Sequence, residues 1–195
     1  MIKLAILASG GGSNANQIIK HFQNHPFISV VLIVTNNPSA MVLNLATISR
    51  IPDIIITKDD IYKSDTFLQT LKEKEIDVII LAGFLWLIPS NLIEAYPDKI
   101  LNIHPSLLPK YGGKGMYGHH VHDAVKTNGE QESGMTIHIV NKEYDDGNII
   151  FQEKCSITES MSSEDIAKEV LKLEHKNYSK IIEQYISNVY KIIKF

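Results

Sequence analysis

The sequence predicts an α/β fold in which a doubly wound, mostly parallel sheet carries helices on both faces. Short apolar runs rich in isoleucine and valine recur along the first half of the chain, as expected of strands that are buried on both faces. Helical patterns alternate with these runs, and this alternation implies parallel strands joined by right-handed crossovers. The 195 residues are 44% hydrophobic and 21% charged, which suits one large domain with a sizeable core.

The regular part of the pattern ends near residue 103. Ser64 is a plausible N-cap, and Pro89 suits a first helical turn. Strands are expected at residues 2–8, 29–35, 53–57, 77–82 and 99–103, and helices are expected to begin near Asn14, Ser39, Ser64 and Pro89.

After residue 103 the alternation gives way to a different arrangement. We expect a glycine-rich loop over residues 105–118, a short helix to about Thr127, and strands around 135–140 and 148–155 that are partly antiparallel. A long helix should run from Ser162 to about Tyr185, because its first residues supply hydroxyls and carboxylates that cap free amides. No repeat or linker divides the chain, so residues 1–195 are expected to form one domain.

Composition excludes several classes of function. A net charge of −3, a pI near 6.2 and the lack of a dense basic cluster argue against nucleic-acid partners. The apolar stretch at residues 2–8 is too short to span a membrane, so no membrane association is expected. The single cysteine, Cys155, has no partner for an internal disulfide, which suits a cytoplasmic protein, and we expect it to be a small buried strand residue.

The glycine loop at residues 9–14, SGGGSN, follows the first predicted strand and opens the first predicted helix. Backbone amides and the helix dipole make such a junction suitable for a phosphate. The loop lacks the lysine of a Walker A motif and completes a dinucleotide fingerprint only weakly, so the phosphate of a mononucleotide fits better. The alternative is a tight turn that needs glycine for its backbone angles alone.

Asn102 and His104 lie at the end of the fifth predicted strand, where alternation sends both side chains to the same side. An amide that donates hydrogen bonds and an imidazole that titrates near neutrality suit addition to a carbonyl group. A histidine at a strand end is more often structural than catalytic. Asp145, followed by Asp146 and Gly147, also has an ordinary interpretation as a turn residue.

The run from Asn102 to Pro109, NIHPSLLP, resembles the signature of the folate-dependent formyltransferases. Residues 82–84, 12–14 and 145–150 resemble other motifs of that family, and the similarity extends from Ile2 to about Lys176, most closely to members that act on glycinamide ribonucleotide. The resemblance implies transfer of a formyl group from 10-formyltetrahydrofolate to the primary amine of glycinamide ribonucleotide in purine biosynthesis. It implies small-molecule partners and no metal, and it allows a homodimer.

The resemblance also assigns roles to residues. Asn102 would donate to the developing oxyanion, His104 would transfer the proton, and Asp145 would raise the pKa of His104 so that a cationic imidazole stabilises the oxyanion. Residues 1–103 would form the phosphate-binding half, and residues 104–195 the catalytic loop, the folate-site strands and the C-terminal helix. Ribonucleotide contacts are assigned to Gly11, Gly12, Ser13, Asn14 and Glu174, and folate contacts to Leu85, Trp86, Leu87, Ile88, Asn102, Val140 and Asp145.

Some features depart from the family pattern or have a second interpretation. Trp86 stands where relatives usually carry a polar or basic side chain, which predicts a different boundary near the tail of the folate, although core packing would also explain a tryptophan. Glu174 could equally lie on a solvated helix face. The loop at residues 110–118 is longer than in the short form of the family, and we expect it to close over the folate.

The histidines that follow this loop leave one assignment open. His119, His120 and His122 come directly after it, and the sequence does not tell which of them reaches the site. They lack an acidic partner and the H-E-x-x-H spacing, so no metal site is expected.

Four alternative functions share some of these sequence features. Methionyl-tRNA formyltransferases share the signature but add a C-terminal RNA-binding barrel, for which this chain is expected to be too short. Deformylases that hydrolyse the same folate carry a regulatory domain ahead of the catalytic one. Formyltransferases acting on sugar amines stay open, although the glycine loop favours a ribonucleotide. A nucleotide-binding module without catalysis is the alternative from another class.

Overall fold

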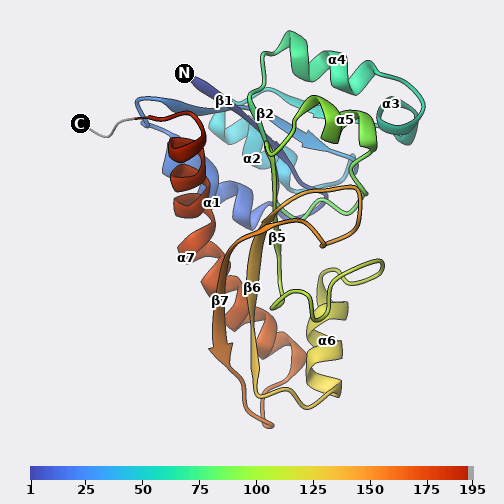
Figure 1. Ribbon diagram of the computed structural model, residues 1–195, viewed down its shortest axis with the longest axis vertical. Coiled ribbons are helices and arrows are strands. Elements are labelled where there is room, and N and C mark those ends of the chain that lie inside the picture. The colour runs from blue at the N-terminus through green and yellow to red at the C-terminus, as the bar shows by residue number, and fades with distance from the viewer. Residues whose placement is uncertain (193–195) are drawn as a thin grey trace.

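The computed structural model describes residues 1–192 and contains a seven-stranded sheet with helices on both faces (Figure 1). The strand order is β3-β2-β1-β4-β5-β6-β7. Strands β1 to β5 pair with one another in parallel, whereas β6 is antiparallel to both β5 and β7. The strands are β1 (Ile2–Leu7), β2 (Ile28–Thr35), β3 (Asp53–Ile55), β4 (Val78–Leu81), β5 (Ile100–His104), β6 (Glu132–Ile139) and β7 (Ile149–Ser156). The predicted fold class is therefore confirmed.

Helices cover the sheet in two layers, which makes it doubly wound. Side chains of α1, α2 and α7 join one core cluster, and side chains of α3, α4 and α5 join the cluster on the opposite face. In Figure 1, α7 runs beside α1 and β7. The helices are α1 (Ser13–Phe22), α2 (Val42–Ser49), α3 (Lys58–Tyr62), α4 (Thr66–Glu73), α5 (Ser90–Ala95), α6 (His119–Thr127) and α7 (Ser163–Val189).

Capping boxes explain where two of the helices, α3 and α7, begin. Ser162 and Asp165 form the expected capping box at α7. The sequence reasoning missed α3, which Thr57 and Asp60 cap in the same way. Ser64 is not the N-cap of α4, because Asp65 occupies that position and makes no side-chain cap bond.

Two expectations about burial are wrong. The third strand is not buried on both faces: Asp53 and Ile55 are exposed, because β3 lies at the edge of the sheet and pairs only with β2. Cys155 is only partly buried, because it lies on β7, the strand at the opposite edge.

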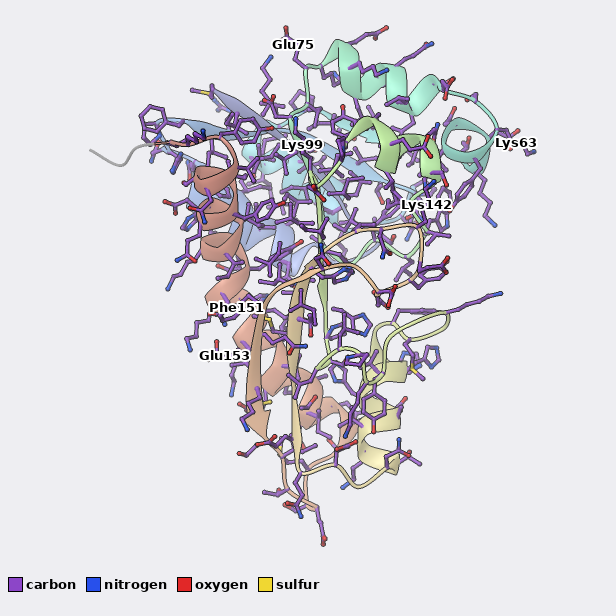
Figure 2. All side chains as sticks on the ribbon, in the orientation of Figure 1. Lys63, Glu75, Lys99, Lys142, Phe151 and Glu153 are labelled. Carbon is purple, nitrogen blue, oxygen red and sulfur yellow. The ribbon has the colours of Figure 1, made fainter. Side chains whose placement is uncertain are left out.

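Three contacts tie α7 to β4 and β5, and α5 to the loop between β6 and β7. Tyr178 of α7 is fully buried, and its hydroxyl donates to the carbonyls of Leu81 (2.8 Å) and Leu101 (3.2 Å) on β4 and β5. Lys142 pairs with Glu94 of α5 at 2.8 Å and so holds the loop between β6 and β7 beside that helix (Figure 2). These contacts fix the region where the predicted site residues lie.

On β7, Glu153 pairs with Lys176 of α7 at 2.6 Å and accepts a hydrogen bond from Asn177, which joins the edge strand to the long helix (Figure 2). Within the described part of the chain, no helix has both the length and the apolar character that crossing a membrane requires.

Candidate active site

A cavity of about 730 Å³ opens at the carboxyl ends of β4 and β5, which is where doubly wound sheets place their ligands. Its walls come from β4, β5, β6, α6 and α7, and from the loops that precede α5, precede α6 and join β6 to β7. The predicted site residues among its lining are Asn14, Leu85, Trp86, Leu87, Ile88, Asn102, His104, Val140, Asp145 and Glu174. We refer to this cavity as the cleft.

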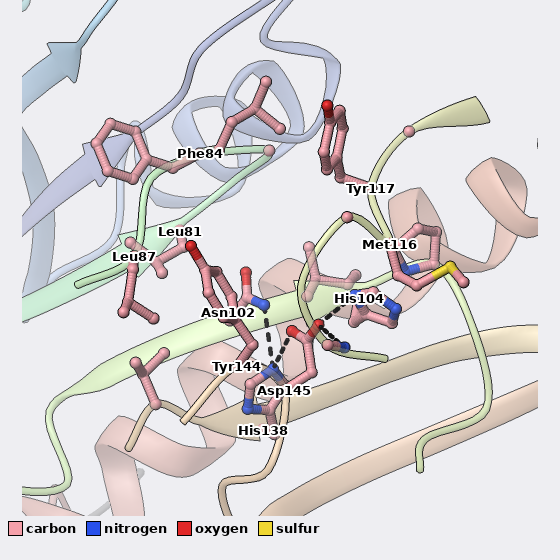
Figure 3. Close-up of a pocket in the computed structure, with 18 of the residues that line it drawn as sticks. Leu81, Phe84, Leu87, Asn102, His104, Met116, Tyr117, His138, Tyr144 and Asp145 are labelled. Atoms are coloured by element: carbon pink, nitrogen blue, oxygen red, sulfur yellow. Dashed lines mark hydrogen bonds and ion pairs between the residues drawn. The ribbon is translucent and has the colours of Figure 1, made fainter. Parts of the chain in front are cut away.

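Asn102, His104 and Asp145 meet in the cleft (Figure 3). Asn102 and His104 share one side of β5, because Leu101 and Ile103 point into the core on the other face. His104 Nδ1 lies 3.5 Å from Asp145 Oδ2, and His104 Nε2 donates to the carbonyl of Tyr111 at 2.7 Å. The His104 side chain is 5% exposed and that of Asp145 is 11% exposed.

His138 belongs to the same constellation, and the sequence reasoning missed it. Its Nδ1 donates to the carbonyl of Ile139 at 3.0 Å, so its Nε2 can accept the hydrogen bond from Asn102 Nδ2, also at 3.0 Å. Asp145 Oδ1 lies 3.6 Å from the same Nε2 (Figure 3). The antiparallel pairing of β5 and β6 sets Asn102 directly opposite His138. The sequence signal that could have identified His138 is a histidine among the apolar residues of a predicted strand.

The loop that carries Asp145 is held by close backbone contacts. Asp145 adopts a positive φ of 53°, and its Oδ2 accepts a hydrogen bond from the amide of Gly113 at 2.9 Å. Two residues later, a Cβ on Gly147 would lie 1.6 Å from the carbonyl oxygen of Ile139. Only glycine allows the loop to lie this close to β6, and this approach places the carboxylate beside His104.

The protonation of His104 differs from expectation. Burial lowers the pKa of His104 below its usual value, and this outweighs the nearby Asp145 carboxylate and the Tyr111 carbonyl, which raise it. From the nearby carboxylate alone, the sequence predicts a cationic imidazole, which is the opposite direction. His104 is therefore a neutral base near neutral pH, with its proton on Nε2.

Asp145 stays ionised although it is largely buried. Burial raises the pKa of its carboxyl, but His138, His104 and the Gly113 amide together hold it below its usual value. The Asp145 carboxylate thus faces two imidazoles. It would stabilise a proton that arrives at His104 Nδ1.

Asn14 and Glu174 meet at another part of the cleft. Asn14 Nδ2 donates to Glu174 Oε2 at 2.7 Å, and Asn14 Oδ1 is buried without a partner among the described residues. Glu174 is 7% exposed, so the interpretation as a solvated helix face is wrong. Burial raises its pKa to about 7, and the bond from Asn14 opposes this shift.

The glycine loop beside Asn14 has one glycine that the backbone requires. Gly12 has a φ of 73°, and a Cβ there would lie 2.9 Å from Val42 Cγ2. Gly10 and Gly11 face open space. Helix α1 starts without a side-chain cap, so its first amides are open to an anion, but Gly11, Gly12 and Ser13 do not line the cleft itself.

Residues 85–88 form one wall of the cleft. The amide of Leu85 donates to Ser9 Oγ at 3.0 Å, which ties this wall to the glycine loop. Trp86 lines the cleft and also packs against the core cluster beneath it, so it takes part in core packing, and its effect on the folate boundary stays a prediction. Val140, directly after β6, completes the wall.

The histidines after the long loop divide into two kinds. His119 and His122 line the cleft, whereas His120 does not. Burial lowers the pKa of His122, and its Nδ1 has no partner in the described part of the chain. Asp123 is an acidic neighbour of these histidines that the sequence analysis did not consider. His119, His120 and Asp123 are exposed, and each has one potential metal-ligand atom within 4.8 Å of the other two.

Comparison with known proteins identifies relatives over nearly the whole chain. Residues 2–182 match the family described as formyl transferase. Phosphoribosylglycinamide formyltransferase of Bacillus subtilis is 35% identical over 95% of both chains. The chloroplastic enzyme of the same name from Arabidopsis thaliana is 41% identical over 92% of this chain.

The solved structures give the same result. The crystal structure of phosphoribosylglycinamide formyltransferase from Bacillus halodurans superposes with a TM-score of 0.86, at 33% identity over 96% of each chain. The chain spans 64% of the Arabidopsis relative and 60% of the relative from Vigna unguiculata. The match over residues 2–182 and the relatives above 30% identity show that the chain belongs to the formyl transferase family.

Proposed function

We propose that the protein transfers the formyl group of 10-formyltetrahydrofolate to the primary amine of glycinamide ribonucleotide, a step of purine biosynthesis. The observation that carries this proposal is the meeting of Asn102, His104 and Asp145 in one cleft. The names of the relatives that match the chain over most of its length support the choice of substrates.

The reaction forms a bond between the amine nitrogen and the formyl carbon and breaks the bond from that carbon to the folate nitrogen. Negative charge develops on the formyl oxygen, and the attacking nitrogen becomes positive. Asn102 Nδ2 donates one proton to His138, so its second proton is free to donate to the oxyanion. Removal of such a donor costs on the order of 3 kcal/mol of transition-state stabilisation.

His104 is the base in this scheme. It is neutral, its Nε2 proton is held by the Tyr111 carbonyl, and its Nδ1 lone pair is free to accept the proton of the attacking amine. The imidazolium that forms donates from Nδ1 toward Asp145 and from Nε2 to Tyr111. His104 then returns the proton to the leaving folate nitrogen, so that no proton is lost overall.

The two ends of the cleft suit the two substrates. Asn14 presents a side-chain amide and Glu174 a carboxylate for the polar acceptor. The open backbone amides at the start of α1 suit its phosphate. The apolar wall of residues 85–88 and Val140 suits the flat rings of the folate, with backbone groups left for its polar edges. The assignments of Gly11, Gly12 and Ser13 to the phosphate stay a proposal.

Substitution of His104 separates this function from a nucleotide-binding module without catalysis. In His104→Ala, formyl transfer from 10-formyltetrahydrofolate to glycinamide ribonucleotide should fall by about a hundredfold or more, while calorimetric binding of the ribonucleotide stays within a few fold of the wild type. Unchanged turnover would reject the role of His104. Activity only on an amino sugar nucleotide would move the function to that alternative.

Four further expectations stay predictions. They are the cytoplasmic location, a homodimer, the division of one domain into halves at residues 103 and 104, and closure of the loop at residues 110–118 over the folate.

A further inference from the structure

Three aromatic side chains are packed together at the wall of residues 85–88. The ring of Trp86 lies 6.1 Å from that of Tyr62 and 6.1 Å from that of Phe84, measured between centroids. Tyr62 is fixed by its hydroxyl, which donates to the carbonyl of Leu87 at 2.8 Å. Phe84 is buried in the core cluster against which Trp86 packs. Trp86 is thus half-buried, supported from two sides, and presented to the cleft.

The charges of the cleft are unfavourable for an anionic ligand tail. Among the described residues that line it, Lys114 is the only lysine or arginine, whereas Glu143, Asp145 and Glu174 are carboxyl groups. Lys142 lies on the adjacent loop but is already paired with Glu94.

Arginine is the side chain best suited to bind carboxylates, because its planar fork makes two parallel hydrogen bonds. The sequence contains a single arginine, Arg50. It lies at the C-cap of α2 and is not among the residues of the cleft. The cleft therefore provides ring surface but no bidentate partner for a carboxylate.

We propose that Trp86 holds the aminobenzoyl ring of the folate donor by stacking, and that the protein leaves the donor's glutamate tail unpaired. The donor would then bind with the same affinity whether it carries one glutamate or several. This inference rests on the proposed function. Aromatic rings prefer offset or edge contacts with centroids about 4.5–7 Å apart, the range in which the three rings of this wall already pack.

Binding of tetrahydrofolate tests the stacking directly. Trp86 is the only tryptophan of the chain, so intrinsic fluorescence at tryptophan wavelengths reports on this one wall. Titration with tetrahydrofolate monoglutamate should quench the emission in parallel with the heat measured by calorimetry. Emission that does not change while calorimetry records saturation would overturn the stacking contact.

Calorimetry with two forms of tetrahydrofolate tests whether the protein binds the glutamate tail. The monoglutamate and the pentaglutamate of tetrahydrofolate should bind within about threefold of each other, with little dependence on salt, because the tail forms no ion pair that salt could screen. A pentaglutamate that binds about tenfold or more tightly would overturn the proposal, because it would require a cationic partner for the tail.

Variants complete the test. Trp86→Phe keeps a ring and should bind the monoglutamate within a few fold of the wild type, whereas Trp86→Ala should weaken binding about tenfold or more. Trp86→Lys should create a preference for the pentaglutamate that disappears at high salt. Phe27→Ala removes an exposed aromatic ring that does not line the cleft, and it should bind like the wild type.

The outcomes separate this inference from the function on which it rests. If the wild-type protein binds neither form of tetrahydrofolate, the proposed function fails. If both forms bind and Trp86→Ala binds them as tightly as the wild type, the proposed function stands and the role of Trp86 is rejected.

Discussion

Replacement of Glu174 by glutamine should stabilise the protein at high pH and leave its stability nearly unchanged at low pH. The carboxyl is 7% exposed, and burial raises its pKa from 4.5 to about 7. Between these two values the folded chain binds more protons than the unfolded chain, so stability falls as pH rises through this window and levels off above it. Glutamine removes the titration and can still accept the hydrogen bond from Asn14.

The size of the effect follows from the shift. Each pKa unit corresponds to about 1.4 kcal/mol, so ionised Glu174 costs roughly 3 kcal/mol at a pH of about 8 and less than about 1 kcal/mol at a pH of about 5. Urea unfolding of the wild type and of Glu174→Gln at both pH values measures this difference. The variant should gain roughly 2–3 kcal/mol at the higher pH and lose affinity for the acceptor ribonucleotide.

A matched control uses another glutamate. Glu73 on α4 is exposed, so Glu73→Gln should change stability by less than about 0.5 kcal/mol at either pH. The reasoning is refuted if Glu174→Gln is no more stable than the wild type at the higher pH, or if its gain is the same at both pH values.

Three other measurements test the site. His138→Ala removes the acceptor that orients the catalytic amide and should lower kcat about tenfold or more in a steady-state assay, with KM changed less; an unchanged kcat would remove His138 from the constellation. Gly147→Ala places a Cβ 1.6 Å from the Ile139 carbonyl, so it should displace the loop of Asp145, lower Tm by several degrees and reduce activity; wild-type values for both would contradict the close approach. The pKa of His104 lies below its usual value and its neutral form is the base, so kcat/KM of Glu174→Gln, which lacks the Glu174 titration near 7, should be flat above neutral pH and fall only as pH drops below about 6.5; a limb above that value in this variant would indicate a cationic His104 in the free enzyme.

The parallel part of the sheet could be predicted because its strands carry their own signal. Apolar runs rich in β-branched residues mark β1, β2, β4 and β5, and the helices between them fix the handedness of the connections. Helix α3 was missed because it has only five residues and depends on a local capping box. The exposure of β3 follows from its place at the edge of the sheet, and that place is a property of the whole topology.

The site could be predicted in part. Alternation along β5 placed Asn102 and His104 on one side, and Asp145 came from the family resemblance. His138 was missed because it reaches Asn102 across an antiparallel pair whose register the sequence does not give. The bond between Asn14 and Glu174 joins residues 160 positions apart, so only the folded chain reveals it.

The protonation state of His104 could not be predicted for a similar reason. A neighbouring carboxylate can be inferred from motifs, but the burial that outweighs it depends on how the Tyr111 turn and the loop of Asp145 close over the ring. The direction of the pKa shift is therefore a consequence of packing, and the sequence argument had the opposite sign.

The central claim is that Asp145 lets His104 take up the proton of the attacking amine. Single-turnover formyl transfer by Asp145→Asn, with both substrates saturating, tests it most directly, because asparagine keeps the shape of the side chain and removes its charge. The account predicts that the rate of the chemical step falls by about a hundredfold or more while the affinity for both substrates stays within a few fold. A chemical step within a few fold of the wild-type rate would contradict it.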